Sequence, residues 1–383
     1  MKNWEVRKLG EVYDVRDGTH DSPKYIKEGF ALVTSKNLKN DVINYNNVNY
    51  ISGEDYININ KRSKVDKGDV LFAMIGTIGN PVVVEKNPDF AIKNVALFKV
   101  PKEQDSYFLK YYLDSSIVID KLSKDAKGAT QKFVGLGYLR NFTIPLPPLP
   151  EQQRIVAILD DAFAYIARAK ANAEQNLKNV KELFENYLHN IFANKGEGWE
   201  EKTLGKVCEY DKTPNKTSDL IYVGLEDIQS NNGKYVGPLT PRSVKSLTFH
   251  FNNEHVLYGR LRPYLNKVLL PDFEGHCSTE IFPIRPKKHI LDRSFLFRWL
   301  IATETMNKIN ATWTGATLPR ANMNTVLEFK INIPPIKEQQ SIIQKLDALS
   351  AETKKLEIIY QQKLNYLEEL KKSILQKAFN SEL

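Results

Sequence analysis

The sequence predicts an α+β protein that consists of two similar globular domains separated by two long antiparallel coiled-coil helices. Three observations support this prediction: an internal repeat, a proline-rich junction in each copy, and a regular spacing of apolar residues after each junction. Two copies of one unit in a single chain also predict a pseudo-twofold arrangement. We expect four segments along the chain: a globular domain at 1–146, a junction and helix at 147–195, a second globular domain at 196–333, and a second junction and helix at 334–383.

The repeat is clearest at the junctions. Residues 144–153 recur as residues 331–340, an offset of 334 − 147 = 187, and each stretch ends in Glu-Gln-Gln. The copies begin at Trp4 and Trp199, where the offset is 195, so the second copy is a net 8 residues shorter between its start and its middle (195 − 187 = 8). The ends of the repeated unit therefore agree, whereas its middle differs.

The spacing of apolar residues after each junction predicts two coiled-coil helices. In the first helix these residues stand at 155, 159, 162, 166, 169, 173, 177, 180, 184, 187 and 191. The second helix uses Ile342, Leu346, Leu349, Leu356, Tyr360, Leu364, Leu367, Ile374 and Ala378, with Thr353 and Lys371 as polar exceptions. A helix of about 40 residues is roughly 60 Å long at 1.5 Å per residue.

The chain leaves along one helix and returns along the other, which predicts antiparallel pairing and brings Trp4 close to Phe379. The alternative is that each helix lies on its own domain.

The globular segments are of mixed type. Runs at 70–75, 82–84 and 96–100 read as strands, with counterparts at 256–258, 267–270 and 280–282. One helix per copy is expected, at about 106–122 and 294–309.

Composition narrows the function. The net charge of +8 favours a polyanionic partner, and no stretch is apolar enough to span a membrane. Cys208 and Cys277 are far apart and fit neither a disulfide framework nor a zinc site, which suits a reducing cytoplasm. The chain has no phosphate-binding loop, and its six histidines form no close ligand pair, so we expect no catalytic or metal site.

A globular region, a proline-rich junction, Glu-Gln-Gln and a long helix, all present twice, resemble the specificity (S) subunits of type I restriction-modification enzymes. The resemblance covers essentially the whole chain. Its most specific marks are the junctions at 147–153 and 334–340 and the Gly-Ala-Thr at 128–130 and 315–317.

The resemblance implies a prokaryotic, cytoplasmic, non-catalytic subunit. Each globular region would be a target-recognition domain that reads one half of a split site in double-stranded DNA, and the helices would be a spacer. Two methylation (M) subunits and restriction (R) subunits would assemble around it. Adenine methylation and cleavage, with S-adenosylmethionine, ATP and Mg, would belong to those partners, and the chain itself would hold no cofactor.

A DNA reader needs Arg, Lys, Asn and Gln at groove edges and basic or hydroxyl groups at phosphates. Arg260-Leu261-Arg262 is expected to continue a strand, with both arginines on one face. The loops after Gly128 and Gly315 are a second expected contact. The candidates are Lys36, Asn37, Arg62, Lys64, Thr130, Gln131 and Lys132 in the first copy, and Arg242, Lys245, Arg260, Arg262, Tyr264, Asn266, Lys267, Arg320 and Asn322 in the second.

For any single candidate the alternative is a solvated surface charge. Two other functions fit the same sequence: a specificity subunit of a type IIB or IIG-like system, and a coiled-coil scaffold whose end domains bind proteins or glycans.

Overall fold

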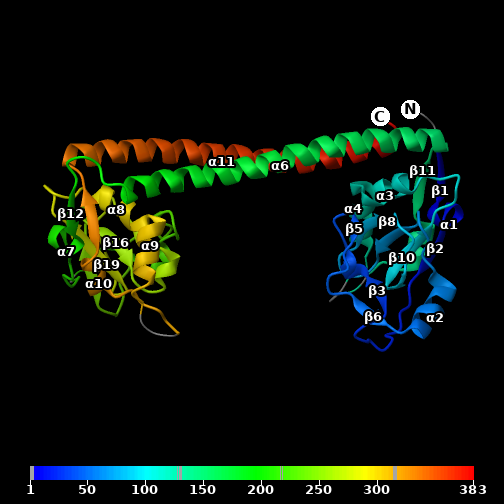
Figure 1. Ribbon diagram of the computed structural model, residues 1–383, viewed down its shortest axis with the longest axis horizontal. Coiled ribbons are helices and arrows are strands. Elements are labelled where there is room, and N and C mark those ends of the chain that lie inside the picture. Colours follow the sequence, from blue (N-terminus) through cyan, green and yellow to red (C-terminus); the bar gives the residue numbers. More distant parts are fainter. Residues whose placement is uncertain (1–3, 127, 129–131, 216, 218, 314–316) are drawn as a thin grey trace. The chain divides into compact units, whose positions relative to one another are not determined.

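The computed structural model describes residues 4–126, 128, 132–215, 217, 219–313 and 317–383 (Figure 1). The chain divides into two compact units. The first unit is Met1–Ala173 with Gln362–Leu383, and the second unit is Glu174–Gln361. Each unit contains one globular domain and a part of each long helix.

The first unit is organised around an antiparallel sheet in the order β2-β10-β7-β8. Its strands are β2 (Asp14–Asp17), β10 (Val95–Lys99), β7 (Val70–Ala73) and β8 (Gly79–Val83). Because side chains alternate along a strand, Val70 and Phe72 enter one hydrophobic cluster while Leu71 and Ala73 enter another on the opposite face. Both faces of the sheet are therefore buried.

Further elements complete the first unit on either side of this sheet. The smaller sheet has the order β6-β3-β9, and its strands are β6 (Asn49–Ile51), β3 (Phe30–Thr34) and β9 (Phe90–Lys93). Two strand pairs are β1 (Glu5–Lys8) with β11 (Thr143–Leu146), and β4 (Leu38–Lys39) with β5 (Val42–Ile43). The helices are α1 (Leu9–Val12), η1 (Ser35–Asn37), α2 (Gly53–Ser63), α3 (Ser106–Asp114), α4 (Ser116–Asp125) and α5 (Leu136–Asn141).

The second unit repeats this plan. Its main sheet, β13-β19-β16-β17, has the strands β13 (Cys208–Tyr210), β19 (Ile281–Pro286), β16 (Val256–Gly259) and β17 (Val268–Leu269). The other strands are β14 (Ile221–Val223), β18 (Gly275–Ser278) and β15 (Thr248–Phe251) in a second sheet, and β12 (Glu200–Thr203) with β20 (Lys330–Ile333). The helices are α7 (Leu204–Val207), η2 (Leu225–Asp227), η3 (Pro263–Leu265), α8 (Arg293–Ile301), α9 (Thr303–Asn310) and α10 (Met323–Leu327). The α+β prediction is confirmed.

The single helix predicted in each copy is interrupted. In the first unit Ser115 separates α3 from α4, with an extended backbone at φ −70° and ψ 150°. Its hydroxyl donates to the carbonyl of Tyr112 at 2.6 Å, a side-chain contact that competes with the helical pattern. Ala302 is extended in the same way between α8 and α9.

Two long helices follow the junctions: α6 (Leu149–Ala193) and α11 (Ile336–Phe379). Within the first unit they run antiparallel, since Lys371 lies over the ring of Phe163 while Lys170 pairs with Glu368 at 2.5 Å. The expected seam is wrong at Tyr187 and Leu356, which are 37% exposed. Leu188 is buried in place of Tyr187. A straight helix has 3.6 residues per turn, so positions spaced alternately by four and three residues drift around its axis and leave the buried face.

The polar position Thr353 is buried within the second unit. It is satisfied locally, because its hydroxyl donates to the carbonyl of Leu349 at 2.9 Å. No helix in the described ranges combines the length and apolar character that a bilayer crossing needs.

The end of each long helix packs on the globular domain of the other copy: α11 ends on the first unit, and α6 ends on the second. In the first unit Phe379 of α11 meets Phe108 of α3 edge to face, with 5.3 Å between ring centroids. In the second unit Phe192 of α6 meets Phe295 of α8 in the same way, also at 5.3 Å. Trp4 packs against the cluster that contains Phe379, which confirms that the two ends of the chain lie together.

Candidate nucleic-acid interface

The second unit brings two predicted DNA-contacting segments together. The backbone after β16 pairs with the loop that precedes α10, through a bridge between Leu261 and Arg320. The amide of Arg262 donates to the carbonyl of Pro319 at 2.7 Å, and the amide of Ala321 donates to the carbonyl of Arg260 at 2.9 Å. The arginines at 260, 262 and 320 therefore belong to one surface.

The first unit has the same backbone arrangement. Ile75 bridges Phe133, the amide of Gly76 donates to the carbonyl of Lys132 at 2.9 Å, and the amide of Val134 donates to that of Met74 at 2.9 Å. Lys132 is exposed. The candidates Thr130 and Gln131 lie outside the described residues. A loop laid against the end of a central strand is thus common to both units, but its side chains differ.

The prediction that residues 260–262 continue a strand is wrong. Strand β16 ends at Gly259, and Arg262 adopts a left-handed backbone with φ 52° and ψ 62°. The corresponding residue of the first unit is Gly76, with φ 79° (262 − 76 = 186, the offset of β16 from β7). Arg260 and Arg262 are therefore not presented by strand alternation, and each has its own environment.

Arg260 and Arg320 share one carboxylate, that of Glu280 (Nε of Arg260 to Oε2, 2.9 Å; Nη2 of Arg320 to Oε1, 2.9 Å). Partial burial pushes the pKa of Glu280 upward, but the hydrogen bonds from Arg320 and Arg260 outweigh it and hold the pKa below its usual value. The Arg260 guanidinium also lies 5.4 Å from the ring centroid of Phe282. Sequence reasoning missed Glu280, because nothing in the spacing indicates that it faces two arginines.

Arg262 is exposed and, among the described residues, its side chain has no hydrogen-bond or ion-pair partner. Tyr264, two residues on, is 52% exposed. The neighbouring candidates serve the fold instead: buried Asn266 donates to the carbonyl of Ile301 at 2.9 Å, and Lys267 donates to that of Leu225 at 2.6 Å.

The remaining candidates of the second unit divide in the same way. Arg242 pairs with Asp227 at 3.0 Å and lies 4.4 Å from the ring centroid of Tyr222. Asn322 caps α10, where its side chain accepts from two backbone amides. Lys245 is exposed and unpaired within the described ranges.

Three of the first unit's candidates, Asn37, Arg62 and Lys64, have partners within the fold. Asn37 is buried and closes η1, where its Oδ1 accepts from Thr34 and its Nδ2 donates to Asn44. Arg62 pairs with the buried Asp17, and Lys64 lies 3.4 Å from Asp66. Lys36 is exposed, with no ion pair in the described part of the chain.

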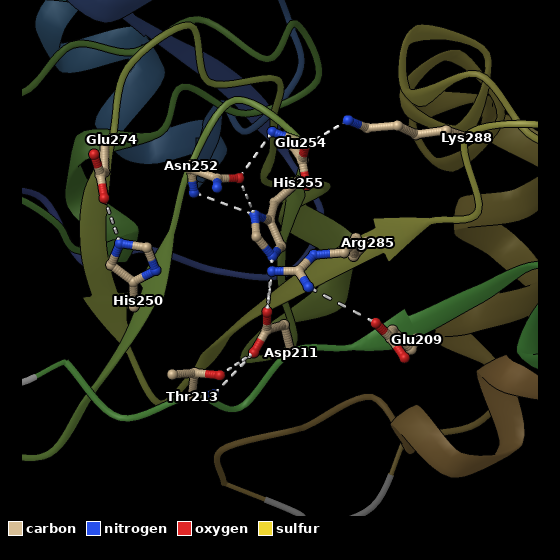
Figure 2. Close-up of polar contacts among 10 residues, drawn as sticks. All are labelled: Glu209, Asp211, Thr213, His250, Asn252, Glu254, His255, Glu274, Arg285 and Lys288. Carbon is tan, nitrogen blue, oxygen red and sulfur yellow. Dashed lines mark hydrogen bonds and ion pairs between the residues drawn. The ribbon is translucent and has the colours of Figure 1, made fainter.

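A polar network links the end of β13, strand β19 and the residue before β16 in the second unit (Figure 2). Asp211 accepts from Thr213 at 2.5 Å and His255 at 3.2 Å, and it pairs with Arg285 at 2.5 Å. Burial opposes ionisation of Asp211, but these contacts lower its pKa to about 2. Burial lowers the pKa of His255 despite the Asp211 contact.

This network forms no metal site. Arg285 occupies the Asp211 carboxylate, and the described residues contain no group of three or more His, Cys, Asp or Glu that could hold an ion.

Two α+β units, each with a loop paired against the end of a central strand, define a repeated domain, and the second presents arginines at that loop. Residues 1–179 and 196–368 both match the type I restriction modification DNA specificity domain. The chain therefore belongs to this family, the specificity subunits of type I restriction-modification systems, and its globular domains are DNA target-recognition domains.

Known specificity subunits are similar to this chain. The chain is 26% identical over 305 residues to the type I restriction enzyme EcoDI specificity subunit of Escherichia coli. This alignment covers 69% of this chain and 68% of the relative. The chain is 24% identical to the putative type I restriction enzyme MjaX specificity subunit of Methanocaldococcus jannaschii, over 91% of this chain and 87% of the relative.

Solved structures have the same fold. The HsdS subunit from Thermoanaerobacter tengcongensis aligns with a TM-score of 0.62 at 21% identity, over 100% of this chain and 98% of that chain. A chain from a study of complex assembly and conformational transition in the type I R-M system aligns with a TM-score of 0.76 at 20% identity, over 100% and 99% of the two chains.

Proposed function

We propose that this specificity subunit reads a split site in double-stranded DNA, one half per globular domain, as a non-catalytic part of a larger enzyme. The observation that carries the proposal is the loop that pairs with the end of a central strand, present once in each unit with different side chains. A common backbone frame with different side chains suits two readers that select different half-motifs.

The side chains support different half-motifs. The second unit has Arg262 at this position, and the first has Gly76 there and Phe133 in place of Arg320. Arginine hydrogen-bonds guanine in the major groove, whereas an aromatic ring contacts the thymine methyl group. Exposed Lys36, Lys132 and Lys245 suit the phosphate contacts that fix orientation without reading sequence.

The partners are those that membership of this family implies, and the repeat suits their number. Two copies of one unit present two equivalent surfaces, which suits two copies of a methylation subunit, with restriction subunits in addition. S-adenosylmethionine, ATP and Mg would be bound by those partners. In this proposal the target-recognition domains are residues 1–146 and 196–333, and the junctions with their helices, 147–195 and 334–383, are the spacer.

The test is to sequence methylated bases in a host that expresses this chain with its methylation subunit. We expect a motif of two specified parts separated by unspecified bases. A single continuous motif would contradict the split-site proposal. Purified chain should also bind duplex DNA with an affinity that falls steeply with salt, whereas salt-independent binding, or none, would favour a protein or glycan scaffold.

A pull-down separates the two kinds of restriction system. Methylation subunits recovered without a nuclease domain fit the type I assembly. Recovery of one fused methylase-nuclease polypeptide would instead indicate a type IIB or IIG-like system.

A further inference from the structure

We infer that Arg262 is the base-reading residue of the second unit, that it recognises guanine in the major groove, and that Glu280 is the residue that positions it. This inference rests on the proposed function, because it assigns a reader to one of the two half-sites.

The backbone of Arg262 is unfavourable for an arginine. A side chain in the left-handed region costs roughly 1–2 kcal/mol, and glycine occupies the equivalent position of the first unit. The surroundings hold Arg262 there, because its amide donates to Pro319 at 2.7 Å and its carbonyl accepts from Leu265 at 2.9 Å. Strain of this kind is typical of functional positions, where the fold keeps a side chain that stability alone would not select.

Of the three arginines on this surface, Arg262 is the one whose side chain is available to a ligand in the described structure. Arg260 and Arg320 both donate to Glu280, so two of the three arginines are engaged within the fold. Arg262 is exposed and has no partner among the described residues, so its five donors can reach a ligand. The ligand that matches a planar fork of donors in duplex DNA is the O6 and N7 edge of guanine.

Glu280 controls this arrangement in two ways. Its carbonyl accepts from the amide of Arg260 at 2.9 Å, and its carboxylate binds the side chains on both sides of the turn, Arg260 before it and Arg320 in the opposing loop. It thereby fixes the segment that presents Arg262. Its single negative charge also offsets part of the double positive charge of Arg260 and Arg320, which would otherwise attract phosphates of any sequence. Glu280 is therefore a positioning residue, and it needs no DNA contact of its own.

The first experiment measures the methylated motif of the complete complex with Arg262→Gly, which suits the left-handed backbone and should fold. We expect one guanine of one half-motif to become unspecified, with about 5- to 150-fold less discrimination there, while the other half-motif is unchanged. Arg262→Lys should retain only part of this discrimination, because the lysine ammonium lacks the planar fork of donors that matches O6 and N7. Lys206→Ala, an exposed cation of α7 outside this surface, is the matched control.

Three outcomes would overturn the assignment of Arg262. If the motif is unchanged in Arg262→Gly, Arg262 is a surface charge without a role in recognition. Equal weakening on all sequences, with the salt slope reduced by about one, means that it contacts a phosphate. Full discrimination by Arg262→Lys at the same guanine means that the planar fork of the arginine is not what selects this base. If the wild-type motif is continuous, the proposed function is refuted. The role of Arg262 as a guanine reader is then tested by the same variants on that continuous motif.

The second experiment tests Glu280 with Glu280→Gln and Glu280→Asp. Glu280→Gln should reduce discrimination at the guanine read by Arg262, tighten binding to unrelated duplex and steepen the salt dependence, because two arginines are released. Glu280→Asp keeps the charge and should restore the shallow salt dependence in large part. If Glu280→Gln changes neither discrimination nor salt dependence, Glu280 has no positioning role. A merely structural role would lower thermal stability without moving the salt slope, which would also overturn the assignment.

Discussion

The backbone amide of Asp105 donates a hydrogen bond at 2.9 Å to the side-chain Oε1 of Gln152. Gln152 is fully buried, and its Nε2 donates to the carbonyl of Pro147 at 2.8 Å. In the second unit Gln339 makes the equivalent bonds to Asp292 and Pro334, each at 2.8 Å. The first Gln of each Glu-Gln-Gln therefore joins the junction to the start of α3 or α8, which explains why both copies have it.

We predict that Gln152→Ala lowers the free energy of unfolding of the first unit by about 1–3 kcal/mol, because it leaves a backbone donor and acceptor without their partner. Gln153→Ala is the matched control, since Gln153 is exposed on the same helical turn and should change stability by less than about 0.5 kcal/mol. Denaturant unfolding of both variants provides the measurement. Equal effects at the two positions would contradict this role of Gln152.

The helix ends should stabilise the unit on which they pack. Phe379→Ala removes edge-to-face contacts with Phe108 and Tyr112 and should cost the first unit about 3–5 kcal/mol. Phe192→Ala should destabilise the second unit, although Phe192 belongs to the first copy of the repeat. Hydrogen exchange resolved by segment tests both variants, and loss of protection in the opposite unit would refute the pairing. Exposed Leu370 on α11 is a suitable control for substitution by Ala.

Arg262→Gly should stabilise the second unit even as it impairs recognition. Glycine avoids the cost of a left-handed side chain but loses more chain entropy on folding, so we expect a net gain of about 0.5–1 kcal/mol. Thermal unfolding of the variant beside the wild type is the measurement. A clear loss of stability would show that the Arg262 side chain contributes contacts that offset its backbone strain.

The buried His255 should make the second unit sensitive to mild acid. Burial lowers the pKa of His255 below its usual value of 6.5, so the folded state binds fewer protons than the unfolded state. Stability from this source is complete above about pH 6.5 and falls as the pH drops from there toward the folded pKa. The Asp211 contribution, from a pKa lowered to about 2, is complete above its usual value of 3.8 and is lost progressively as the pH falls from there through about 2.

His255→Asn removes the titrating group and should flatten the dependence of unfolding free energy on pH between about 7 and 5. His289→Asn is the control, because His289 is exposed. Denaturant unfolding at several pH values gives the comparison. An unchanged slope in His255→Asn would mean that other groups govern stability in this range.

The sequence by itself determined the repeat, the α+β class and the two long helices. Helical periodicity and a conserved register between copies are local properties, so Leu159 and Leu346 could be placed on buried helix faces from their spacing alone. Spacing along the chain was a less accurate guide to where a helix ends and to which side chain of a helical turn is buried. Ser115 ends a helix through its own hydroxyl, and Tyr187 is exposed because the buried stripe shifts to Leu188.

Only the tertiary structure decided which candidate side chains are available for DNA. Lys267 and Asn266 resemble DNA-binding residues in the sequence, but they bind backbone carbonyls far away in the chain. Glu280 pairs with both Arg260 and Arg320, whereas Arg262, whose backbone is left-handed, has no side-chain partner among the described residues. Such partners are set by contacts between residues 20 to 42 positions apart, and spacing along the chain does not encode them.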